Sequence, residues 1–251
     1  MSDAFRHIWT ITKRELNGYF ASPVAYVFIV IFLLLTGFFT FSTRLGSFFE
    51  IGQASLDYSF FQWHPWLYLV LVPAIGMRLW AEERRLGTME LLLTMPITAW
   101  QAIVGKFLAS WIFLIISLAL TFPVVITVRH LGHPDMGTIW SGYFGSALLA
   151  GAYLGITCLT SAFTRNQVIS FIISVVICLF LVLAGFEPVT SMIVNWAPAW
   201  LMKIVTGFSV MPHFFSFQRG VIDTRDLLFF LSIIGFSLFC NGVVIRNLRA
   251  G

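Results

Sequence analysis

The densest run of charge in this 251-residue chain is the stretch Glu82–Pro96, which lies between two long apolar segments. It opens with two acidic residues, Glu82 and Glu83, followed by two basic residues, Arg84 and Arg85. So much charge is too costly to place in the hydrocarbon core of a bilayer, so the stretch lies outside it. We expect it to form a short rigid helix that a partner protein recognises through charge and shape.

The sequence has no pattern that indicates catalysis or metal binding, and we expect neither catalytic residues nor a metal. His130 and His133 lie beside a proline, which favours an exposed turn over a metal site. The three cysteines all fall in apolar segments, where packing explains them better than a disulfide framework. No G-x-x-x-x-G-K-[ST] motif occurs, because Gly105-Lys106 is followed by Phe107. If ATP drives this protein, ATP and Mg²⁺ bind to another chain.

The composition predicts one all-α integral membrane domain over residues 1–251. Hydrophobic residues make up 59% of the chain, charged residues make up 10%, and the mean hydropathy is +0.90, whereas roughly 25% of residues are charged in a soluble domain. The basic residues form no exposed run, so we expect no nucleic-acid partner. A membrane helix needs about 20 apolar residues. Six segments reach or approach that length, namely Val24–Thr43, Pro65–Ala81, Phe107–Val128, Met136–Phe163, Gln167–Phe186 and Leu227–Ile245.

The apolar stretch before the last span is interrupted by Pro188, Pro198 and Pro212. No uninterrupted piece of it has spanning length, so we expect 187–226 to be an outer segment of short helices that dip into one leaflet. Six spans place both termini on one side. Ten of the 15 lysines and arginines then fall on that side, which makes it the cytoplasm. Because a charged helix precedes the first apolar run, we expect no cleavable signal peptide.

Residues 1–22 have the period of an amphipathic helix. Apolar positions recur on one face and polar positions on the other, namely Phe5, Ile8, Trp9, Thr12, Leu16, Tyr19 and Phe20 against Arg6, Thr10, Lys13 and Asn17. A basic amphipathic helix beside a span lies in the membrane interface. Ser22-Pro23 supplies an N-cap followed by proline at the first helical position, so the first span begins there. The helix either anchors the chain alone or also contacts a cytoplasmic partner.

Helix signals also divide the charged stretch. Gly87 interrupts the helix that leaves the membrane, and Thr88 is a good N-cap for a new one. Glu90 lies in the first turn, where the helix dipole favours negative charge, and Leu91 follows it before the proline that stops the helix. A capping box at 98–101 then starts the helix that enters the third span. An ordinary solvated connector is the other interpretation that these residues leave open.

The run Glu82–Pro96 followed by Gly105-Lys106 resembles the intracellular loop of type-2 ATP-binding-cassette (ABC) permeases, in which a coupling helix contacts the ATPase subunit. The stretch Arg14–Tyr26 resembles the N-terminal signature of the gliding-motility-type and copper-processing-type branch. Phe217–Asp226 resembles the outer segment before the last span of those permeases. The resemblance covers essentially the whole chain, with the three motifs in the same order.

The resemblance implies a multi-pass permease subunit in a bacterial inner membrane, without a nucleotide site of its own. Its partners would be two copies of a cytoplasmic ABC ATPase, a second permease that is a copy or a relative, membrane lipid and an auxiliary membrane-anchored protein with a large periplasmic domain. The residues assigned to ATPase coupling are Glu82, Glu83, Arg84, Arg85, Gly87, Thr88, Glu90, Leu91 and Pro96. Those assigned to the interfacial helix are Arg6, Trp9, Lys13, Arg14 and Glu15. Those assigned to the transport path or the dimer seam are Phe28, Phe32 and Phe39.

The expected function is ATP-driven export or movement of a lipophilic or polymeric substrate. The five long spans contain no Asp, Glu, Lys or Arg, which argues against an ion-coupled carrier. None shows the polar stripe of a passive channel. A membrane scaffold of a motility or envelope complex is the alternative. The small residues Ala147, Gly151 and Gly155 recur at helical spacing, which suits close packing either within the subunit or at a dimer seam.

Overall fold

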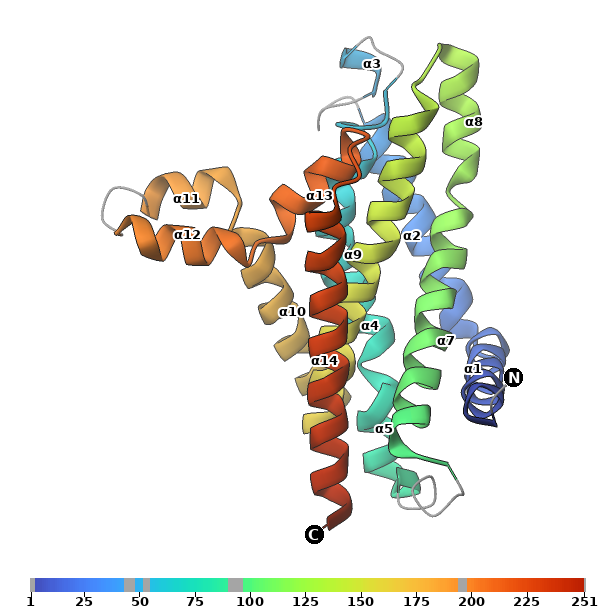
Figure 1. Cartoon of the computed structure of the whole chain (residues 1–251). Helices are drawn as coiled ribbons and strands as arrows, with labels where there is room; N and C mark the ends of the chain where they lie inside the picture. Colours follow the sequence, from blue (N-terminus) through green and yellow to red (C-terminus); the bar gives the residue numbers. More distant parts are fainter. Residues whose placement is uncertain (1–2, 43–47, 52–54, 90–96, 194–197, 251) are drawn as a thin grey trace.

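A computed structural model describes residues 3–42, 48–51, 55–89, 97–193 and 198–250, and every regular element within these ranges is a helix (Figure 1). The predicted all-α class is therefore confirmed for the described residues. The elements in chain order are α1 (Asp3–Ala21), α2 (Pro23–Phe41), α3 (Phe48–Ile51), the 3-10 helix η1 (Phe61–Trp63), α4 (His64–Gly76), α5 (Arg78–Leu86), α7 (Ala99–Ala119), α8 (Phe122–Leu131), α9 (Met136–Phe163), α10 (Gln167–Leu183), α11 (Glu187–Ile193), α12 (Ala199–Gly207), α13 (Val210–Gln218) and α14 (Thr224–Ala250).

Four helical stretches in the described residues are long and apolar enough to cross a membrane. They are Pro23–Phe41, Ala99–Leu131, Met136–Phe163 and Thr224–Asn247. The other two predicted spans coincide with helices that are shorter. The span predicted at Gln167–Phe186 corresponds to α10, which has 17 residues, and the span predicted at Pro65–Ala81 includes α4, which has 13. The structure thus supports four candidate spans among the described residues, and the full count of six remains a prediction.

One predicted span is divided between α4 and α5, which meet at Met77. Pro73 lies inside α4, where proline weakens the helical hydrogen-bond ladder. Beyond the break, the N–H groups of Trp80 and Ala81 both donate to Oγ of Ser161 in α9, each at 3.0 Å. That hydroxyl donates in turn to the Met77 carbonyl at 2.9 Å. The helix can therefore break without leaving buried N–H groups unpaired.

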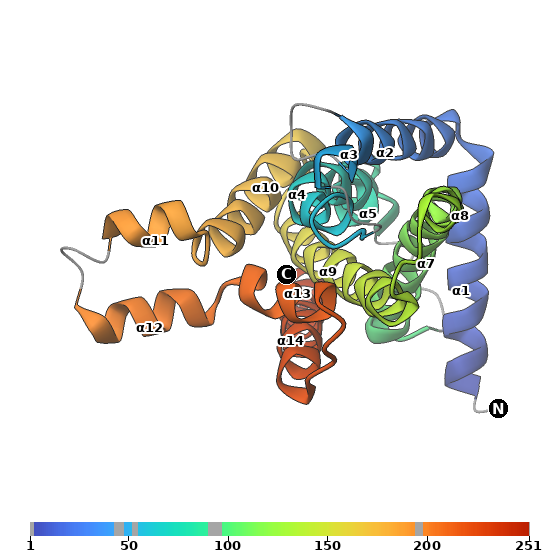
Figure 2. The same ribbon diagram turned by 90° about the horizontal axis from the view of Figure 1, so that it is seen from above.

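The long helix α9 lies at the centre of the bundle, and α4, α7, α10, α13 and α14 pack around it (Figure 2). Its small residues allow this close approach. A Cβ on Gly151 would lie 2.9 Å from Nε1 of Trp111, and one on Gly155 would lie 3.3 Å from Cβ of Ser237. The indole N–H of Trp111 donates to the Ala147 carbonyl at 2.8 Å. The row of small residues therefore serves packing within the subunit.

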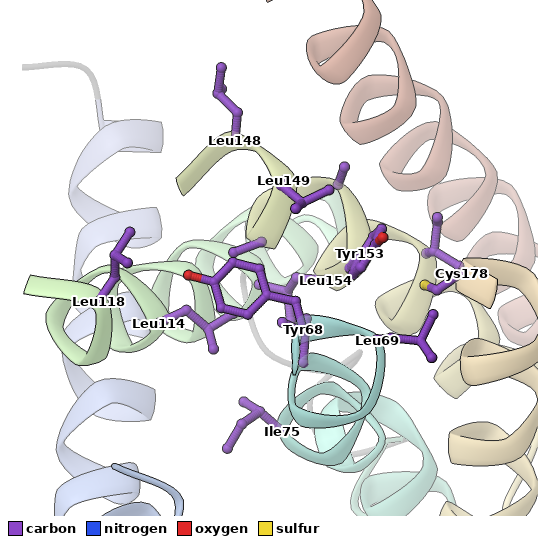
Figure 3. Packing of buried hydrophobic residues seen from close by; sticks show 14 of the residues in the cluster. Tyr68, Leu69, Ile75, Leu114, Leu118, Leu148, Leu149, Tyr153, Leu154 and Cys178 are labelled. Atoms are coloured by element: carbon purple, nitrogen blue, oxygen red, sulfur yellow. The ribbon is translucent and has the colours of Figure 1, made fainter. Parts of the chain in front are cut away.

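The core at the middle of the bundle is apolar. Tyr68 and Leu69 of α4, Tyr153 and Leu154 of α9 and Cys178 of α10 are all buried there (Figure 3). These buried residues hold α4 and α10 against the central helix α9.

The helix α1 crosses the bundle instead of running along it. It is seen nearly end-on in Figure 1 and along its length in Figure 2. Ser22 accepts a hydrogen bond from the Val24 N–H at 3.3 Å and Pro23 opens α2, so the predicted N-cap is confirmed. The α5 end is the name used here for the end of the bundle where α5 stops and α7 begins, and α14 also terminates there (Figure 1).

The segment before the last span contains α11, α12 and α13. The helices α11 and α12 project sideways, whereas α13 packs against α9 (Figures 1 and 2). Pro188 lies in the first turn of α11, Pro198 is the N-cap residue of α12, and Pro212 lies in the first turn of α13. These are positions where a helix tolerates proline. The depth of this segment in a membrane remains a prediction.

Candidate functional site

The predicted helix break at Gly87 is confirmed. Gly87 ends α5 in the left-handed conformation, with φ of 71°, and its N–H donates to the Glu83 carbonyl. Glycine adopts this conformation without the strain that a Cβ would cause. The hydroxyl of Thr88 donates to the same carbonyl at 3.5 Å. Gly87 and Thr88 therefore share one acceptor at the end of α5.

Residues 90–96 lie outside the described part of the chain. The assignments of Glu90, Leu91 and Pro96 remain predictions, as does the short helix to which they would belong. The capping box predicted to follow is confirmed, because Thr98 Oγ1 accepts from the Gln101 N–H and the Gln101 side chain accepts from the Thr98 N–H.

Two of the predicted coupling residues face other helices of this chain. Arg84 Nη1 donates to the Ala162 carbonyl at 2.5 Å, near the end of α9. Basic side chains often satisfy the last carbonyls of a helix in this way. Glu83 Oε1 lies 2.7 Å from Nζ of Lys106 in α7. The residues Arg84 and Glu83 therefore attach α5 to α9 and α7.

The outward side of α5 carries Glu82, Arg85 and Leu86. Glu82 and Arg85 form a loose pair at 3.8 Å, with 40% and 60% of their side chains exposed, and such a pair contributes little to stability. Leu86 is also exposed. A partner that approached the α5 end would meet these three side chains.

Lys106 lies at the point where α1, α5 and α7 meet. Its side chain is only 4% exposed, and Nζ lies 3.3 Å from Oε1 of Glu15 in α1 as well as 2.7 Å from Glu83. The ammonium also lies 5.6 Å from the centroid of the Trp80 ring, within the range of a cation–π contact. A buried ammonium is stable only with such partners. Lys106 therefore links three helices by charge.

The charges around Lys106 balance. Arg14 Nη2 lies 2.8 Å from Oε1 of Glu15. Two cations and two carboxylates therefore alternate in a row of ion pairs, in the order Arg14, Glu15, Lys106 and Glu83. Burial by itself raises the pKa of the Glu15 carboxyl, but Lys106 and Arg14 outweigh burial and hold that pKa below its ordinary value. Glu15 is therefore held in its ionised form.

The close approach of α1 to α7 depends on Gly105, the residue before Lys106. A Cβ there would lie 2.8 Å from Cγ2 of Ile11, so a larger residue would push α1 away. Thr12 Oγ1 donates to the Gly105 carbonyl at 3.2 Å, and the Tyr19 hydroxyl lies 2.8 Å from Oγ of Ser110. Part of the predicted apolar face of α1 thus packs on α7.

The remaining residues assigned to the interfacial helix point outward. Arg6, Lys13 and Arg14 are exposed, and Trp9 is 54% exposed. An exposed tryptophan beside exposed cations is typical of a helix that lies in a membrane interface.

A cavity of about 300 Å³ opens beside the Lys106 pairs, between α1, α2, α4 and α5. Its lining combines charged and apolar side chains. The charged ones are Glu15, Arg78, Glu82, Glu83 and Lys106.

The phenylalanines assigned to a path or a dimer seam lie mostly inside the subunit. Phe28 and Phe32 are buried in its core, and Phe39 stacks on Trp63 with ring centroids 4.6 Å apart. The exposed face of α2 carries other apolar residues, among them Leu34. A second chain beside α2 would meet that exposed face first.

The described residues contain no group of three or more His, Cys, Asp or Glu placed to hold a metal ion. His130 Nδ1 lies 3.0 Å from the Ile126 carbonyl of its own helix.

The role of Lys106 is not evident from the sequence. A single lysine just before a span looks like an ordinary interface residue, and neither Glu15 nor Glu83 is near it in sequence. One sequence signal is informative in retrospect. Gly105 is a small residue that allows close helix packing, and it stands beside the lone cation Lys106 at the start of an apolar helix.

The chain was compared with models of protein families. The model described as "ABC-2 family transporter protein" matches residues 66–235, from α4 into α14. A search of curated proteins found none that matches the chain.

Proposed function

Because the chain belongs to the ABC-2 family of transporter membrane proteins, we propose that it is the permease subunit of an ATP-driven transporter in a bacterial inner membrane. A permease of this family implies a partner ATPase, on which ATP and Mg²⁺ would bind. Two copies of that ATPase would serve a pair of permeases. The proposed branch is the gliding-motility-type or copper-processing-type one, on the motifs at Arg14–Tyr26 and Phe217–Asp226.

The proposed topology has six spans with both termini in the cytoplasm. It is supported by the common position of the α5 end and the end of α14 at one end of the bundle (Figure 1). In this topology the fifth and sixth spans are α10 and the α4–α5 pair, in addition to the four longer candidate spans. The α5 end then faces the cytoplasm, where an ATPase would dock.

The observation that carries the mechanism is the set of pairs that Lys106 makes with Glu15 and Glu83. An ATPase that closes on ATP would push the outward side of α5 and the 90–96 segment. Because Glu83 is paired with Lys106, the push would reach α7, and through Glu15 it would reach α1. The bond from Arg84 to the α9 carbonyl carries the same displacement into the centre of the bundle.

This arrangement favours a rigid-body movement. Ser161 of α9 bonds to three backbone groups around the α4–α5 break, so α5 and α9 are fixed to each other at two points. A displacement of α5 would therefore rotate the bundle as a unit and alternate access to a path between two permeases. The proposed substrate is lipophilic or polymeric, and its movement is outward or lateral.

The experiment is purification from native membranes in a mild detergent, followed by identification of bound proteins by mass spectrometry. We expect a P-loop ATPase in stoichiometric amount. Reconstitution of that complex should then give ATP-dependent movement of a fluorescent lipid in liposomes, and the matched control is the ATPase with its Walker A lysine replaced by alanine. A complex that binds ATPase and moves nothing would favour a scaffold. Conduction without nucleotide would favour a channel.

A further inference from the structure

The cavity beside Lys106 has an apolar half and a charged half. The apolar half is lined by Val24, Ala25, Ala74, Ile75 and Leu79. Val24 and Ala25 belong to the first turn of α2, directly after the Ser22-Pro23 turn that begins the first candidate span. The cavity therefore lies at the level where the chain enters the membrane, between the crossing helix α1 and the bundle.

The charged half contains one cation, Arg78, for which no hydrogen bond or ion pair is found among the described residues. Lys106 is matched by Glu15 and Glu83, and Glu15 also by Arg14. Arg78 lines the same cavity, is exposed, and makes no hydrogen bond or ion pair with the part of the chain that the structure describes. An anionic group in the cavity would be attracted to Arg78, because the guanidinium binds phosphate and carboxylate with paired N–H donors.

The charged half also has an acceptor without a donor. Glu83 uses Oε1 for Lys106, while its Oε2 is buried and has no hydrogen-bond partner among the described residues. A buried carboxylate oxygen without a donor is unfavourable. Glu82 also lines the cavity at its outer edge, where its loose pair with Arg85 leaves 40% of its side chain exposed, and it is one helical turn from Arg78.

A fitting ligand has an acceptor for Arg78, a donor for the glutamates one turn away and an apolar part for the rest of the cavity. We propose that the cavity binds an aminophospholipid of the membrane. Its phosphate would lie at Arg78, its primary ammonium would lie between Glu82 and Glu83, and its glycerol and upper acyl chains would lie against the apolar half. A two-carbon ethanolamine linker separates the phosphate from the ammonium, which suits groups that are one helical turn apart.

The proposed contacts predict which headgroups bind. An ethanolamine ammonium has N–H donors for Oε2 of Glu83, whereas the trimethylammonium of choline has none. Phosphatidylglycerol has the phosphate and lacks the cation that the glutamates would attract. The site should therefore prefer phosphatidylethanolamine. This preference rests on contacts within the chain and goes beyond the proposed function, because it requires neither ATP nor a transported substrate.

The test is native mass spectrometry of the purified chain with phosphatidylethanolamine, phosphatidylcholine or phosphatidylglycerol of identical acyl chains. We expect the ethanolamine lipid to bind at least about tenfold more tightly than the choline lipid, because one charge-assisted hydrogen bond distinguishes them. Arg78→Gln should weaken its binding by a similar factor. Arg129→Gln, at the opposite end of the bundle, is the matched charge control.

A second variant fills the cavity without changing a charge. Gly18 lines the cavity, and a Cβ on it meets no atom within 4 Å, so Gly18→Leu should fold and exclude the lipid. Gly235→Leu in α14 is the matched control, since a Cβ on Gly235 is equally unobstructed. Equal binding of the ethanolamine and choline lipids would overturn the proposal. So would undiminished binding of the ethanolamine lipid to both Arg78→Gln and Gly18→Leu.

Discussion

Replacement of Lys106 by methionine should weaken the attachment of α1 and α5 to α7. Methionine keeps much of the length of the side chain and removes its charge, so the cavity left behind is small. The Lys106 side chain is 4% exposed and its ammonium lies 2.7 Å from Glu83 and 3.3 Å from Glu15. The substitution strands both carboxylates in partly buried positions.

The free-energy cost of Lys106→Met can be estimated from the burial of the two carboxylates. Removal of one partner from a fully buried ion pair costs about 3–5 kcal/mol. Glu83 and Glu15 keep 20% and 22% of their side chains exposed, and Glu15 retains Arg14. We therefore expect a loss of about 2–3 kcal/mol in the free energy that holds α1 on the bundle, or roughly 30- to 150-fold in the equilibrium for its release.

The assay is hydrogen–deuterium exchange of the protein in lipid nanodiscs. Exchange in α1 should rise by that factor in Lys106→Met, whereas exchange at the centre of α9 should not change. Lys13→Met, at an exposed position of α1, is the matched control. The double variant Lys106→Met with Glu15→Gln should recover part of the loss, because the charge that Lys106→Met strands on α1 is gone. Equal exchange of α1 in Lys106→Met and Lys13→Met would show that the Lys106 pairs do not hold α1 on the bundle.

Three further predictions concern the same end of the bundle. Gly105→Val should displace α1 at a cost of about 1–3 kcal/mol, measured as a lower thermal transition temperature in detergent. Gly37→Val is the control, because a Cβ there meets nothing within 4 Å, and it should have little effect on that temperature. Ser161→Ala leaves two backbone N–H groups without their acceptor and should destabilise the α4–α5 break by about 1–3 kcal/mol, and unchanged exchange at residues 78–82 would contradict this. Because the Glu15 pKa is lowered in the fold, its pairs stabilise α1 at neutral pH and are lost as pH falls below the ordinary value of 4.5. Glu15→Gln should weaken α1 docking at neutral pH and remove this acid-dependent loss, and a pH profile of exchange in α1 identical to that of the unmodified chain would count against it.

The local features of the fold could be predicted from the sequence. The Ser22 cap, the left-handed Gly87 and the capping box at 98–101 each depend on a few neighbouring residues, and each is found where the sequence placed it. Their free energy comes from hydrogen bonds within one turn, so no knowledge of the tertiary fold is required.

The tertiary features could not be predicted in this way. Glu83 appears in sequence as a surface charge, but Lys106 lies opposite it once α5 and α7 pack. In the apolar run that begins at Pro65, Pro73 indicates a weakened helix but does not place the break at Met77, because the hydroxyl that makes that break tolerable belongs to Ser161, 84 residues away. Phe32 looks available for a path, yet it is buried by α4 residues such as Tyr68. Each outcome depends on which helices meet, and periodicity along one helix does not contain that information.

In the proposed mechanism, an ATPase docks at the α5 end and drives the bundle through the Lys106 pairs. The most direct test places a photo-crosslinking amino acid at Leu86, which is 63% exposed at the α5 end, in cells that make the native complex. A matched control places it at Ile222, which is 59% exposed in the segment before α14. We predict that a P-loop ATPase is crosslinked from position 86 and not from position 222. Crosslinks from position 86 that contain no ATPase, or the same products from both positions, would rule out ATPase docking at the α5 end.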